Sequence, residues 1–134
     1  MKTTLGFALA ATVGFVLAVA PLMGHHSFAA EFDGAKPLDL TGTVTKVDWV
    51  NPHSWVYIDV KSGDGTVENW GLETGPPNVL YRSGWRKDTV KPGDAIQVHG
   101  FVAKDGSHTL AAREITTPDG RKLFAGSPDN GPKQ

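Results

Sequence analysis

Apolar and polar side chains alternate along much of the chain, and this alternation predicts β-strands. In residues 38–50 the apolar side chains stand first at even-numbered and then at odd-numbered positions. This change indicates a long strand with a β-bulge near Lys46. Residues 54–60 alternate strictly, and residues 66–73 follow after a glycine-rich turn. The simplest arrangement of these three consecutive strands is an antiparallel meander.

The pattern changes at residues 75–85, where prolines stand at the start and a glycine stands near the end. This arrangement is typical of a short helix. Alternation returns at residues 96–102, after a Pro-Gly turn, and at residues 109–117, after an Asp-Gly turn. Residues 121–124 are expected to form a short return after a further Pro-Asp-Gly turn.

This order of elements predicts the all-β class and, within it, a small OB-fold-like barrel of five strands. One short helix is expected between the third and fourth strands of that barrel. The domain is expected to span residues 38–125, and the polar, Gly- and Pro-containing residues 126–134 are expected to be a disordered tail. An open β-sandwich is the alternative, although a sandwich needs no helix at that position.

An apolar run at residues 5–20 stands behind a single lysine and ends among small residues, as in a secretory signal peptide. The run is short for a membrane span, and an uncleaved anchor is the alternative. Cleavage is expected after Ala20 or after Gly24, which makes residues 1–24 the signal peptide and residues 25–37 an N-terminal arm. The mature protein is therefore expected in the periplasm, with no membrane span.

The chain has 134 residues, a formal net charge of −1 and no cysteine. This charge argues against nucleic-acid binding, because nucleic-acid affinity depends on Lys and Arg contacts to phosphates. The lack of cysteine excludes disulfides, thiolate metal sites and cysteine nucleophiles. The sequence contains no hydrolase, dinucleotide-binding or zinc-protease motif, and its carboxylates are scattered singly. We therefore expect a binding protein and not an enzyme.

Histidine is the best ligand that a cysteine-free chain offers to a transition metal such as copper. The candidates are His25 and His26 near the expected cleavage sites, His53 after the first strand and His108 before the fifth. The two loops that carry His53 and His108 form the ligand-binding rim of an OB-fold, and Glu73 is a further candidate ligand. Cleavage directly before His25 would expose an amine that can chelate copper together with its imidazole. The alternative interpretation is structural, with solvated or turn-capping histidines.

Aromatic side chains offer a second binding chemistry. Trp55 and Tyr57 share the face of the second strand that points away from the core, where rings can stack on a ligand. With Glu73 at the end of the next strand, this face is the candidate site of a non-enzymatic interaction module for a glycan, a peptide or a partner protein. Trp70 and Trp85 are expected in the core, because large aromatic side chains dominate small cores.

Several short motifs follow one another in a specific order. They are HHSFAAEFD at 25–33, TGTV at 41–44, NPH at 51–53, GW at 84–85 and KPGD at 91–94. In their order and spacing they resemble the DUF6152 family of small exported bacterial proteins, whose function is unknown. The resemblance implies export and a His-His pair soon after the signal peptide, but it implies no activity. In that family the pair tends to follow the signal peptide directly, whereas Met23 and Gly24 precede it here.

Overall fold

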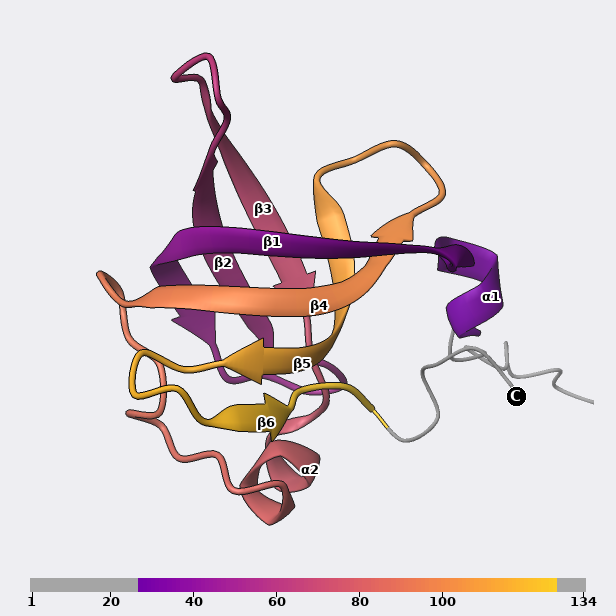
Figure 1. Ribbon diagram of the computed structural model, residues 1–134. Helices are drawn as coiled ribbons and strands as arrows, with labels where there is room; N and C mark the ends of the chain where they lie inside the picture. Colours follow the sequence, from indigo (N-terminus) through magenta and orange to yellow (C-terminus); the bar gives the residue numbers. More distant parts are fainter. Residues whose placement is uncertain (1–26, 128–134) are drawn as a thin grey trace, which may run out of the picture.

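The computed structural model describes residues 27–127, and β-strands dominate them (Figure 1). In chain order the elements are α1 (Phe28–Glu31), β1 (Phe32–Asp48), β2 (Trp55–Lys61), β3 (Val67–Glu73), α2 (Pro77–Arg82), β4 (Ala95–Ala103), β5 (Thr109–Thr116) and β6 (Lys122–Phe124). The prediction of a mostly β chain is confirmed. The expected signal peptide at residues 1–24, His25, His26 and most of the expected tail lie outside the described residues.

The six strands form one sheet in the order β3-β2-β1-β4-β5-β6, and neighbours in this order are antiparallel. Residues 71–73 of β3 also pair with residues 109–111 of β5, in parallel. The register of β1 against β2 shifts between Val44 and Lys46, which confirms the predicted bulge. Because of the additional pairing, β2, β3 and β5 lie side by side.

The helix α2 lies between β3 and β4 in the chain. Proline stands at its start, and a glycine follows its end. Pro77 stands at the start, where its missing N–H leaves no helical hydrogen bond unmade. Beyond the last turn, Gly84 has a φ of +95°, a left-handed conformation that favours glycine. Within residues 27–127, no helix has the length and hydrophobicity needed to cross a membrane.

The core is built from alternate residues of the strands. Its buried side chains include Val44, Val56, Ile58, Leu72, Ile96, Val98, Leu110 and Ile115. Trp85 completes the core beside α2, and its indole Nε1 donates a hydrogen bond to the carbonyl oxygen of Phe124 at 2.9 Å. Trp85 is therefore a core residue, as predicted. Trp70 is only partly buried, and its ring stacks on His108 at the surface.

The N-terminal arm differs from the prediction. The sequence predicts the first strand from residue 38, but β1 begins at Phe32 and directly follows α1. Phe28 and Phe32 are buried with Ala111 in a second apolar cluster, and the Phe28 ring meets the Phe101 ring edge to face at 5.6 Å. Burial of these rings holds the arm against β4 and β5, an effect that strand alternation does not detect.

Gly100 lies where β4 and β5 approach most closely. The register shifts between His99 and Gly100, and a Cβ on Gly100 would lie 2.3 Å from the carbonyl oxygen of Ala111. We expect Gly100→Ala to lower the free energy of unfolding by about 1–3 kcal/mol, because the backbone must move apart. Gly63→Ala is the matched control, since nothing lies within 4 Å of a Cβ there. Urea denaturation checks this expectation, which equal stabilities of the two variants would contradict.

Candidate functional site

The outward face of β2 and β3 carries the candidate binding side chains. Trp55 lies opposite Glu73, and Tyr57 lies opposite Gly71. Directly opposed residues of antiparallel strands project from the same side of a sheet. Val56, between the two rings in sequence, is buried on the other side. Trp55 and Tyr57 therefore point away from the core, as the alternation predicts.

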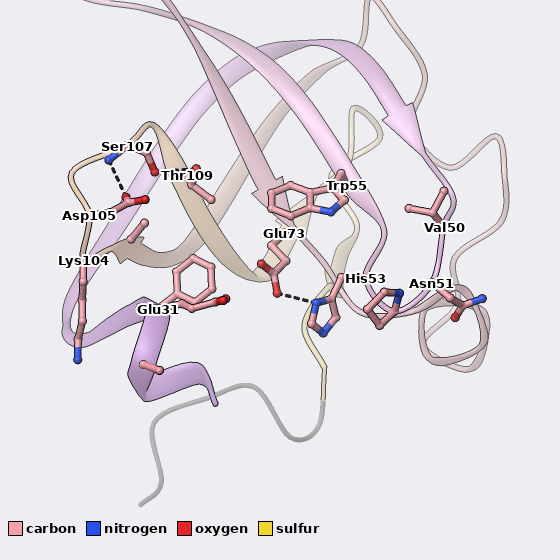
Figure 2. A pocket seen from close by; sticks show the side chains of 14 residues that line it. Glu31, Val50, Asn51, His53, Trp55, Glu73, Lys104, Asp105, Ser107 and Thr109 are labelled. Carbon is pink, nitrogen blue, oxygen red and sulfur yellow. Dashed lines mark hydrogen bonds and ion pairs between the residues drawn. The ribbon is translucent and has the colours of Figure 1, made fainter. Parts of the chain in front are cut away.

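An open pocket of about 770 Å³ lies at one end of this face (Figure 2). Its walls come from α1 and the start of β1, from the β1–β2 loop and from the β4–β5 loop. The lining residues are Ala30, Glu31, Phe32, Val50, Asn51, Pro52, His53, Trp55, Glu73, Ala103, Lys104, Asp105, Ser107 and Thr109. A pocket of this volume is within the range of small-molecule sites. Folding thus brings three of the candidates, His53, Trp55 and Glu73, to one pocket.

His53 and Glu73 contact each other in this pocket. Nδ1 of His53 lies 2.8 Å from Oε1 of Glu73, and the two side chains are 25% and 8% exposed. The neighbouring backbone holds them in place, because the Ser54 N–H donates to the Gly75 carbonyl and the Thr74 N–H donates to the Ser54 carbonyl. The Thr74 hydroxyl donates to the same Ser54 carbonyl at 2.9 Å. These bonds attach the β1–β2 loop to the end of β3 and keep the imidazole beside the carboxyl group.

The pocket is acidic. Burial raises the pKa of Glu73 to about 7, and the negative charge of Glu31 adds to this shift. Figure 2 shows Glu31 and Glu73 extending into the same space from α1 and β3. Asp105 adds a third acidic side chain to the lining, which contains one lysine, Lys104, and no arginine. Such a lining favours cations over anions.

His108 lies apart from His53. Its ring stacks on Trp70 with the centroids 4.9 Å apart, and its Nε2 lies 3.6 Å from Oε2 of Glu68. These contacts place His108 at a separate hollow with Trp70, and it does not line the His53 pocket. His99, on β4, forms an exposed pair with a carboxylate of β1. The structure therefore brings Glu73 to His53 but does not bring His108 there.

Glu31 and Asp105 also line the pocket, although no local pattern in the sequence marks them as pocket residues. Glu31 belongs to the motif at 25–33, but its approach to the pocket requires α1 to pack beside β4, and the motif does not reveal that packing. Among the described residues, no group of three or more His, Cys, Asp or Glu side chains is arranged to hold a metal ion. A metal ion bound at His53 would thus take further ligands from solvent or from residues outside this part of the chain.

Comparison with known proteins identifies the family. The sequence profile of a family of unknown function, DUF6152, matches residues 14–112. No curated protein is significantly similar to the chain. The matched region contains His25, His26 and His53, together with the whole outward face of β2 and β3. The chain therefore belongs to the DUF6152 family.

Proposed function

We propose that this protein is an exported, periplasmic binding protein that holds a transition-metal ion, copper foremost, in the pocket at His53. His25 and His26 supply further ligands, and Glu73 orients the His53 imidazole. The role is storage, delivery or tolerance of the metal, without a catalytic step. The observation that carries the proposal is the 2.8 Å contact between Nδ1 of His53 and Oε1 of Glu73.

That contact has the form found around metal-binding histidines. Such a histidine binds the metal through one ring nitrogen, while the other nitrogen donates a hydrogen bond to a carboxylate or carbonyl oxygen. In His53 the nitrogen beside Glu73 is Nδ1, so Nε2 is the atom that would bind the metal. The carboxyl group then fixes the tautomer and the orientation of the ring.

The covalent chain supports the participation of the His-His pair. His26 directly precedes Ser27, and Ala30 and Glu31 already line the pocket. At about 3.3–3.6 Å per residue, a side chain this close in sequence can reach the pocket. The acidic lining attracts a cation, and imidazole is the preferred copper ligand of a chain without cysteine.

We further propose that the sheet is an OB-type barrel. Support comes from the order β1-β2-β3-α2-β4-β5 and from the pairing of β3 with β5, which joins the two ends of the order β3-β2-β1-β4-β5. OB-folds bind ligands over their second and third strands, between the loops that follow the first and fourth strands. The pocket at His53 lies between the corresponding loops.

Native mass spectrometry of the protein purified from the periplasm, followed by copper titration, tests the metal proposal. We expect a mature chain that begins at His25 and binds one copper ion. His53→Ala removes a proposed ligand and is expected to weaken copper binding by at least the roughly 10- to 100-fold that loss of a ligand-orienting partner costs. His99→Ala is the matched control, because it removes an imidazole from another surface. A mature protein that takes up no copper, or a His53→Ala variant with unchanged affinity, would refute the proposal.

A further inference from the structure

Trp55 and Tyr57 form an aromatic strip on the outward face of β2. Their ring centroids are 6.2 Å apart, and the ring planes differ by only 18°. Because the two residues are two positions apart in one strand, the strip runs along that strand. Trp55 also lines the His53 pocket, so the strip begins at the pocket and leads away from it.

Gly71 of β3 lies beside the aromatic strip and contributes no side chain. A Cβ built on Gly71 would lie 3.5 Å from a ring carbon of Trp55 and 3.5 Å from a ring carbon of Tyr57. The two rings therefore reach over the backbone of β3 at this position. Any side chain larger than alanine would project into the rings and interrupt the aromatic strip.

Hydrogen-bonding side chains border the aromatic strip. Glu73 lies at the pocket end, and at the other end Nδ2 of Asn69 donates to Oδ1 of Asp59 at 2.8 Å. The Lys46 ammonium lies over the Tyr57 ring, 5.5 Å from its centroid, and 2.8 Å from Oδ2 of Asp48. Amide, carboxylate and ammonium groups thus accompany two nearly parallel aromatic rings.

We propose that the aromatic strip binds an uncharged, β-1,4-linked glycan. A sugar ring combines an apolar C–H face, which packs on an aromatic ring, with a rim of hydroxyl groups, which needs polar partners at the edge. A β-1,4 linkage keeps successive sugar rings in an extended, flat chain, whereas an α-1,4 linkage curves the chain. The Trp55 and Tyr57 ring planes differ by only 18°, so the two rings present nearly parallel faces to such a flat chain.

The charges around the strip argue against anionic ligands with flat rings. Asp48, Asp59 and Glu73 border it, and Asp48 offsets the charge of Lys46. These carboxylates repel the phosphates of a nucleic acid and the acid groups of a uronic-acid polymer. An uncharged glycan meets no such repulsion, and its hydroxyl groups can donate to the same carboxylates.

Cellohexaose and maltohexaose are matched probes, because both are linear glucose hexamers and only the linkage differs. We expect calorimetric titration in the presence of EDTA to show binding of cellohexaose, of hexa-N-acetylchitohexaose, or of both, with maltohexaose binding at least about tenfold more weakly. Trp55→Ala and Tyr57→Ala are each expected to weaken binding by about tenfold. Tyr81→Ala is the control, since it removes an exposed ring from α2. EDTA makes the result independent of the proposed copper site.

Trp55→Phe separates loss of stacking from loss of folding. The phenylalanine variant keeps a ring in the strip and is expected to retain most of the affinity for the glycan. It therefore provides a test even if Trp55→Ala does not fold. No binding of either β-1,4-linked hexamer would overturn the proposal, as would equal affinity for maltohexaose. Unchanged affinity in Tyr57→Ala would overturn it as well, because a ligand on the strip must contact both rings.

Discussion

Replacing Trp85 with alanine is expected to lower the free energy of unfolding by about 3–5 kcal/mol. Trp85 is 1% exposed and is the largest fully buried side chain of the described residues. Its ring meets that of Trp49 edge to face at 6.4 Å, and its Nε1 donates to the Phe124 carbonyl. The substitution would leave a cavity beside α2 and would remove the donor to that carbonyl. We therefore expect α2 and β6 to lose packing together.

Urea denaturation followed by circular dichroism measures this loss. Tyr81→Ala is the matched control, because Tyr81 is 38% exposed although its ring also packs on Trp49. The control is expected to cost less than about 1 kcal/mol. If Trp85→Ala were no more costly than Tyr81→Ala, the assignment of Trp85 as a major core residue would be wrong.

Glu73→Gln is expected to abolish a decline in stability that the wild-type protein shows between about pH 4.5 and about 7. Burial raises the pKa of Glu73 from 4.5 to about 7, so the folded state holds this proton more tightly than the unfolded state does. The contribution is therefore complete below about pH 4.5 and is lost as the pH rises to about 7. Above that range the glutamine variant is expected to be the more stable protein, by about 2–3 kcal/mol.

Denaturation with urea at a series of pH values gives the two stability curves. Glu68→Gln is the control, because it neutralises a partly exposed carboxylate near the start of the same strand, β3. That variant is expected to keep the wild-type pH dependence. His53 and Glu31 are present in both variants, so the difference between the two curves reports the Glu73 carboxyl group together with its contact to His53. A Glu73→Gln curve parallel to that of the wild type would mean that another group titrates.

The two proposals for this face depend on different side chains. Copper binding depends on His53 beside Glu73, whereas glycan binding depends on the parallel rings of Trp55 and Tyr57. Only Trp55 belongs to both the pocket and the aromatic strip. His53→Ala and Tyr57→Ala therefore test one proposal each, and the outcome of one test does not decide the other.

The strands could be predicted because their burial alternates with a period of two residues. In β2, Val56 and Ile58 are buried while Trp55 and Tyr57 point outward, and this order is readable from seven consecutive residues. The bulge of β1 was equally visible, because an extra residue reverses the parity of the apolar positions. The start of β1 could not be predicted from the sequence, because Phe28 and Phe32 are buried against strands that are distant in the sequence.

The candidate site could be predicted only in part. The sequence places His53 and His108 in two loops of one expected rim, but it does not determine the direction of either side chain. The pairing of β2 with β3 brings Glu73 to His53, and the β4–β5 hairpin places His108 on Trp70 instead. Each outcome depends on strand register and on packing between strands, which are not local properties.

The sequence by itself determined the mostly β character of the chain, the positions of its turns and its membership of the family. Alternation, proline and glycine act on the backbone within a few residues, so their effects are readable locally. Only the tertiary structure decided that Glu73 accompanies His53, that Glu31 shares its pocket and that Phe28 anchors the arm. These contacts join segments far apart in the chain, and their geometry follows from the register of the sheet and the burial of apolar surface.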